Sequence, residues 1–136
     1  MLMIKTYLSK SNISGIGVFA AEDIAKGTVT WIASDFFDLK ISPTVVQNLS
    51  PLERKHFEEL DYFWIDKSGN YVLPLDHDRF MNHSFEPNII SKDDGVDIAA
   101  RDIKAHEELT IDYRTIVPRD QWEPYFSDEQ AKNHSH

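Results

Sequence analysis

Residues 79–88 read Arg-Phe-Met-Asn-His-Ser-Phe-Glu-Pro-Asn, and this stretch sets hydrogen-bonding side chains directly beside aromatic and aliphatic ones. Pro87 restricts the backbone to a turn, so we expect Asn82, His83 and Asn88 to be partly buried. Buried polar groups need hydrogen-bond partners. The sequence leaves two sources of partners open, the protein's own backbone and a polar ligand.

Residues 107–113, further along the chain, read Glu-Glu-Leu-Thr-Ile-Asp-Tyr and contain the β-branched and aromatic residues that favour a strand. Strand alternation predicts Leu109, Ile111 and Tyr113 on one face. One interpretation is a core strand that ends in a tyrosine. The other places the Tyr113 hydroxyl at the end of a rigid element, where functional groups are often held.

Residues 14–19, near the start of the chain, read Ser-Gly-Ile-Gly-Val-Phe and place two glycines before a predicted strand. Gly15 and Gly17 either form a tight turn between strands or let the backbone approach a ligand closely. A dinucleotide-binding fingerprint needs a helix that opens at the loop, whereas Val18 and Phe19 are typical of a strand. That class of site is excluded.

The rest of the chain predicts a mostly β protein with few helices. Short apolar runs alternate with turn-forming residues, and the segments 67–70 and 92–95 are predicted hairpin turns. Ser50, Pro51 and Glu53 mark the start of a helix whose apolar residues continue at helical spacing. A shorter helix of one or two turns is predicted within 43–49.

Length and composition favour one domain. The chain has 136 residues, of which 41% are hydrophobic, enough for one core but too few for two. We expect a single domain over 1–126, including an aromatic C-terminal segment that packs back on it, and a polar, disordered tail over 127–136. Since we find neither a signal peptide nor a membrane-spanning run, we expect an intracellular protein of the cytoplasm or nucleus.

Charge and cysteine content exclude several classes of function. The net charge of −9 argues against direct nucleic-acid binding and favours basic partners. Because there is no cysteine, disulfides, a cysteine nucleophile and thiolate metal sites are all excluded. We predict no bound metal; a metal-dependent enzyme that uses Asp76, His77 and His83 is the alternative, although these residues match no zinc-protease or iron-triad pattern.

The three stretches, in this order and at these separations, resemble those of the SET-domain protein-lysine methyltransferases. The resemblance runs from about Ile4 to Tyr113. It implies a β-clip-like fold of small curved sheets, with a C-terminal pseudoknot and one or two short helices. It also implies methyl transfer from S-adenosylmethionine to a lysine of a histone or other basic protein. The alternative is a non-catalytic SET-like module that binds the cofactor or a basic peptide.

The same resemblance implies roles for individual residues. Tyr113 is expected to be the catalytic tyrosine. Asn82 is expected to hold the methionine end of the cofactor, and His83 to meet the adenine through its backbone. The backbone groups expected to line the cofactor site are those of Gly15, Ile16 and Gly17.

The chain departs from the family pattern after the last stretch. Many members bind zinc through cysteines there, whereas this chain contains none. Aromatic tails cover the cofactor in members without zinc, so Trp122, with Tyr125 or Phe126, is expected to do the same here; simple core packing is the alternative. Very small members complete the substrate groove by dimerising, and we expect a homodimer.

Overall fold

Three small β-sheets and a few short helices make up the protein. The computed structural model describes residues 1–60, 63–93, 95–117, 130 and 133. The elements are β1 (Thr6–Lys10), β2 (Ile16–Ala20), β3 (Val29–Ile32), β4 (Asp38–Ile41), α1 (Pro43–Gln47), α2 (Pro51–Glu58), β5 (Trp64–Ile65), β6 (Tyr71–Pro74), the 3-10 helix η1 (His77–Phe80), β7 (Asn82–His83), β8 (Ile89–Asp93), β9 (Val96–Ala99), β10 (Glu108–Ile111) and the 3-10 helix η2 (Tyr113–Thr115).

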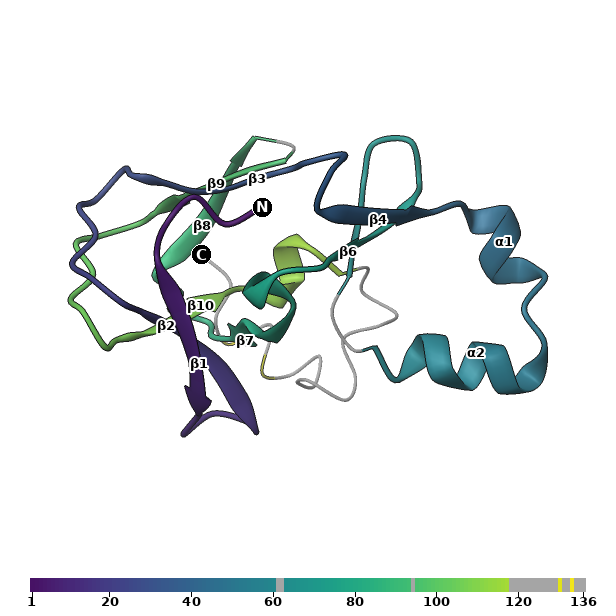
Figure 1. The fold of residues 1–136 in the computed structure, drawn as a ribbon, viewed down its shortest axis with the longest axis horizontal. Coiled ribbons are helices and arrows are strands. Elements are labelled where there is room, and N and C mark those ends of the chain that lie inside the picture. Colours follow the sequence, from purple (N-terminus) through teal and green to yellow (C-terminus); the bar gives the residue numbers. More distant parts are fainter. Residues whose placement is uncertain (61–62, 94, 118–129, 131–132, 134–136) are drawn as a thin grey trace.

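The sheets have the orders β1-β2-β10-β7, β3-β9-β8 and β4-β6-β5. Figure 1 shows the β3-β9-β8 sheet at one end of the molecule and α1 with α2 at the other, while β7 and β10 lie between them. Strands β5 and β6 pair antiparallel, as do β8 and β9, so both predicted hairpins are confirmed. The predicted mostly β fold with one or two short α-helices is confirmed over the described residues.

The centre of the structure is a parallel pairing of two segments that are distant in sequence. Strand β10 pairs with β7, Thr110 opposite Asn82 and Ile111 opposite His83. On its other side β10 pairs antiparallel with β2, with Leu109 opposite Val18. All three stretches singled out in the sequence therefore meet in one sheet. The threading of the predicted pseudoknot stays a prediction.

Leu109, Ile111 and Tyr113 all belong to the core, as the predicted shared face requires, and Thr110 on the opposite face is buried as well. Leu109, Thr110 and Ile111 are each 7% exposed or less. Strand β10 ends before Tyr113, which begins η2 instead of closing the strand. The physical reason is the Asp112 side chain, whose carboxylate accepts the backbone N–H of Arg114 and so caps the 3-10 helix.

The hydrophobic core surrounds this strand. Its members are the buried residues Val18, Ala20, Ile24, Met81, Ile89, Ala99, Ile103, Leu109, Ile111, Tyr113 and Val117. Because these residues come from both ends of the chain, the core forms only when the N-terminal and C-terminal halves are brought together.

The two α-helices begin where the sequence predicts. Ser50 caps α2, its side chain accepting from Glu53 N while the Glu53 carboxylate accepts from Ser50 N, which is a complete capping box. Helix α1 likewise begins after a capping serine, Ser42. None of the α2 residues is buried, and Leu52 is 64% exposed, so its predicted apolar face does not enter the core.

Asn88 ties the turn after β7 to β10 by hydrogen bonds that substitute for strand pairing. Its side-chain oxygen accepts from Thr110 N at 2.8 Å, and its amide donates to Glu108 O at 2.8 Å. Asn88 is 3% exposed, so the partly buried, hydrogen-bonded asparagine predicted from sequence is confirmed, with backbone as its partner.

We expect Asn88→Ala to lower the free energy of unfolding by about 2 to 4 kcal/mol, because it leaves a buried N–H and a buried C=O of β10 unpaired. Urea denaturation measures this loss. Asn48→Ala is the matched control, since Asn48 makes one exposed hydrogen bond to Thr44 O and its loss should cost less than about 0.5 kcal/mol. Equal effects of the two substitutions would contradict the role assigned to Asn88.

Candidate functional site

The predicted site residues of the three stretches lie together around β7 and β10. Asn82 and His83 form β7, Ile16 begins β2, and Tyr113 begins η2 just after β10. Gly15 takes a φ of +47°, a backbone conformation that favours glycine, in the turn between β1 and β2. The tight-turn interpretation of the glycines is therefore confirmed for Gly15.

The Asn82 amide is anchored to the turn between β1 and β2. Its Nδ2 lies 3.0 Å from Ser14 O, 3.3 Å from Ile16 O and 3.1 Å from Ser11 Oγ. The same nitrogen donates to Glu108 Oε1 at 2.9 Å. All these partners are oxygen acceptors. The protein itself thus supplies partners for the amide nitrogen of Asn82.

Ser11 and Glu108 complete this cluster, and the sequence analysis missed both. Ser11 Oγ donates to Glu108 Oε2 at 2.9 Å and accepts from the backbone N–H of Ile13. A methyl group built on Gly17 would collide with the Glu108 carboxylate, so this glycine makes room for a side chain of its own protein. Glu108 stood within a stretch already singled out, but its approach to Gly17 follows from the β2–β10 pairing.

His83 bridges β7 and the start of η2. Its Nδ1 accepts the backbone N–H of Tyr113 at 3.0 Å, so we infer that this nitrogen carries no proton. The 3.9 Å approach of Nδ1 to Asp112 Oδ1 is therefore not an ion pair. The imidazole ring also contacts Phe85 edge to face, with 4.4 Å between ring centroids. These contacts hold the His83 backbone beside β10.

Tyr113 is buried, and its hydroxyl is held in place. The hydroxyl donates to the backbone carbonyl of Met81 at 2.6 Å, and only 7% of the residue is exposed. The phenol thus acts as a donor to the backbone, and a phenol oxygen has acceptor lone pairs as well. Tyr113 lies two residues beyond the end of β10, at the start of η2, so its hydroxyl is held beside a rigid strand as the second interpretation of the sequence expects.

Asp112 and Arg114 frame the tyrosine on either side. Arg114 Nε donates to both carboxylate oxygens of Asp112 at 3.0 Å, and these hydrogen bonds raise the pKa of Arg114 above its ordinary value. The guanidinium also lies over the Phe85 ring, 4.9 Å from its centroid. Sequence reasoning had assigned neither charge a role.

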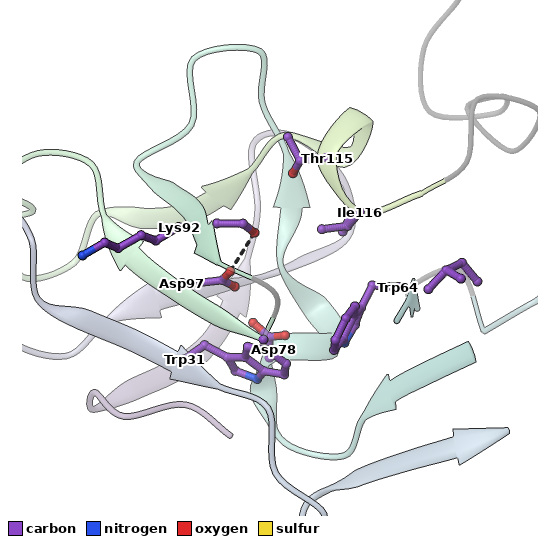
Figure 2. Close-up of a pocket in the computed structure, with 10 residues that line it drawn as sticks. Trp31, Trp64, Asp78, Lys92, Asp97, Thr115 and Ile116 are labelled. Carbon is purple, nitrogen blue, oxygen red and sulfur yellow. Dashed lines mark hydrogen bonds between the residues drawn. The ribbon is translucent and has the colours of Figure 1, made fainter. Parts of the chain in front are cut away.

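A cavity of about 310 Å³ lies between the β3-β9-β8 sheet and η2. Figure 2 shows its lining, which consists of Trp31, Trp64, Ile65, Asp78, Ser91, Lys92, Gly95, Asp97, Thr115 and Ile116. The two indole rings meet edge to face at 5.9 Å. The cavity borders the helix that begins at Tyr113, but Asn82 and His83 do not line it.

The Asp97 carboxylate is buried at the edge of this cavity. It accepts a hydrogen bond from Ser91 Oγ at 2.7 Å, drawn as a dashed line in Figure 2. Burial raises the pKa of Asp97 to about 6, against the lowering effects of the Ser91 bond and of the positive N-terminus. Near neutral pH this side chain therefore holds a negative charge that the fold disfavours.

The metal alternative finds no support in the part of the chain that the structure describes. Those residues contain no group of three or more histidine, cysteine, aspartate or glutamate side chains that could hold a metal ion. Asp76 instead accepts from the backbone N–H groups of Leu2 and Asp78, and His77 contacts Thr6 Oγ1 at 2.9 Å. Trp122, Tyr125 and Phe126 lie outside the described residues, so the predicted aromatic cover stays a prediction.

Comparison with known proteins agrees with this geometry. The SET domain family matches residues 15–114, from the glycine turn to the residue after Tyr113. The chain belongs to the SET-domain family. It is similar to the histone-lysine N-methyltransferase trr of Drosophila melanogaster, with 29% identity over 79% of the chain, although it spans only about 5% of that protein.

Solved structures show the same SET fold. A humanized mutant of the Chaetomium thermophilum Polycomb Repressive Complex 2, bound to an inhibitor, matches 90% of the chain and 16% of the solved chain, with 26% identity and a TM-score of 0.64. A second Chaetomium complex, bound to S-adenosylmethionine, is similar in fold over 85% of the chain and 16% of the solved chain, with 24% identity and a TM-score of 0.63. The fold class implied by the three stretches is confirmed. In the described residues, no helix is long and apolar enough to span a membrane.

We expect Asp97→Asn to stabilise this SET domain above pH 6. A folded pKa near 6 exceeds the ordinary 3.8, so the carboxyl group destabilises the fold increasingly as the pH rises from about 4 through 6. Urea denaturation at pH 7.5 should show the variant more stable by about 1 to 3 kcal/mol, and at pH 4 about equal to wild type. Asp35→Asn, at an exposed carboxylate, is the control; a pH-independent gain from Asp97→Asn would contradict the burial argument.

Proposed function

We propose that this SET domain transfers methyl groups from S-adenosylmethionine to the side chain of a protein lysine. The observation that carries the proposal is the Tyr113 hydroxyl, buried and bonded to Met81 O at the meeting point of β7 and β10. The histone-lysine methyltransferase relatives lend the same activity further support.

The cofactor fits the described residues at the turn between β1 and β2. The Asn82 amide nitrogen donates to acceptors of the protein itself. No described residue donates a hydrogen bond to Asn82 Oδ1, so this oxygen can accept one from an ammonium group. We assign the cofactor site to Asn82, His83, Gly15, Ile16, Gly17 and Trp122. When bound, S-adenosylmethionine supplies an electrophilic methyl group on a sulfonium.

The chemistry left to the protein is to present a neutral amine and stabilise the charge that develops on it. A free lysine has a pKa near 10.4, so its ammonium must lose a proton before its nitrogen can attack. Desolvation next to the buried Tyr113 lowers that pKa, so that water can take the proton before the nitrogen attacks. The lone pairs of the Tyr113 oxygen then stabilise the positive charge as it moves to the nitrogen.

A basic protein is the substrate class that the charges favour. The chain carries a net charge of −9. The cavity that borders η2 is lined by Asp78 and Asp97 against a single Lys92, so acidic side chains outnumber basic ones there too. We propose a histone or another lysine-rich protein of the nucleus or cytoplasm as substrate, no direct nucleic-acid contact, and a homodimer as the working form.

We expect the purified protein to transfer labelled methyl groups from S-adenosylmethionine to lysine in a panel of histones and ribosomal proteins. Tyr113→Phe should lower kcat by about 10² to 10³, because it removes the oxygen that faces the developing charge. The Kd for the cofactor should change less than about twofold. Tyr7→Phe is the control, since it removes a surface hydroxyl bonded to His106. Cofactor binding without any transfer would favour the non-catalytic module.

We expect Asn82→Ala to weaken S-adenosylmethionine binding by about tenfold to a hundredfold, since it removes the acceptor assigned to the cofactor's ammonium. Isothermal titration calorimetry measures the affinity, and circular dichroism establishes that the variant folds. The control is Asn70→Ala, which loses one 3.3 Å contact to Asp66 far from β7 in the fold. An unchanged affinity of the Asn82→Ala variant for S-adenosylmethionine would contradict the assignment of Asn82 to the cofactor site.

A further inference from the structure

We infer that Glu108, acting with Ser11, is a positioning residue that orients the Asn82 amide toward the amino-acid end of the cofactor. This inference rests on the proposed function and deepens it. The carboxylate of Glu108 bridges the other two side chains, Oε1 accepting from Asn82 Nδ2 and Oε2 accepting from Ser11 Oγ, each at 2.9 Å. The three side chains come from the turn after β1, from β7 and from β10.

The chemistry of this cluster permits only one orientation of the amide. An ionised carboxylate only accepts hydrogen bonds, and the Ser11 hydroxyl donates its hydrogen bond to Glu108. Asn82 therefore faces four oxygens that act as acceptors, one each from Ser11, Ser14, Ile16 and Glu108. If the amide were rotated by half a turn, its oxygen would face these four acceptor oxygens and would form no hydrogen bond with them. Asn82 Oδ1 must point away from the cluster.

The cluster also makes that oxygen a better acceptor. A carboxylate that accepts from an amide N–H polarises the amide, so more negative charge gathers on its oxygen. Asn82 is half-buried, so the residue is in part open to solvent. An ammonium group is the donor that gains most from such an oxygen. The α-ammonium of the cofactor's methionine end has this chemistry.

Gly17 has an indirect part in this arrangement. Because any Cβ at Gly17 would collide with the Glu108 carboxylate, the second glycine of the turn reserves the space in which Glu108 sits. Its contribution to cofactor binding then passes through Glu108 and Asn82. Gly17→Ala should accordingly displace Glu108 and reproduce the effect of removing its carboxylate.

The test compares two ligands that differ at the methionine end. S-adenosylhomocysteine carries the ammonium and carboxylate, whereas 5′-methylthioadenosine lacks both. Calorimetry should show Glu108→Ala weakening S-adenosylhomocysteine binding by about tenfold or more, with 5′-methylthioadenosine binding changed less than twofold. Glu108→Gln keeps one acceptor for Asn82 and should recover part of the loss. Ser11→Ala and Gly17→Ala, each of which keeps the carboxylate, should show the same ligand selectivity.

The control is Glu107→Gln, which alters the neighbouring exposed carboxylate bonded to Arg101 and should leave both affinities unchanged. Equal weakening of both ligands by Glu108→Ala, Ser11→Ala and Gly17→Ala would show a merely structural role and overturn the inference. So would unchanged binding of S-adenosylhomocysteine. Wild-type protein that binds the ligand but transfers no methyl group would overturn the proposed activity alone. Wild-type protein that binds neither ligand would overturn both.

Discussion

The parallel pairing of β7 with β10 is the constraint on which the rest of the structure depends. It joins residues 82–83 to residues 110–111 and so brings a polar segment from mid-chain against a strand near the end of the described chain. The same strand holds β2 on its other edge. The candidate cofactor residues and the tyrosine hydroxyl therefore lie on one rigid frame, and the backbone ladder fixes their separation.

Polar contacts complete what this pairing begins. Asn88 bonds the backbone of β10 from one side, and the side chains of Ser11, Asn82 and Glu108 connect β10 to the turn after β1 from another. Each of these bonds lies where a missing partner would leave a polar group partly or wholly out of water, which is costly. The site is thus built from groups that also stabilise the fold.

Much of the fold, and the three stretches that meet at the candidate site, could be predicted because local signals are strong. Ser50 and Glu53 predicted the start of a helix, and in the structure they form a capping box there. The order of the three stretches indicated the family. The shared core side of Leu109, Ile111 and Tyr113 follows from strand alternation, whereas the burial of Thr110 on the other face depends on packing from distant segments, which nothing local encodes. Ser11 was not predicted as a site residue, because the role of a serine depends on the residues that its hydroxyl contacts in the fold.

The sequence by itself determined the mostly β class, the positions of turns and helix starts, the family, and the residue types at the candidate site. These follow from backbone preferences and side-chain chemistry, which act over a few residues. The tertiary structure alone decided that Glu108 occupies the space beside Gly17, that Asn82 turns its amide nitrogen inward, and that the Tyr113 hydroxyl bonds Met81. Those outcomes depend on strand register between distant segments, which no local preference encodes.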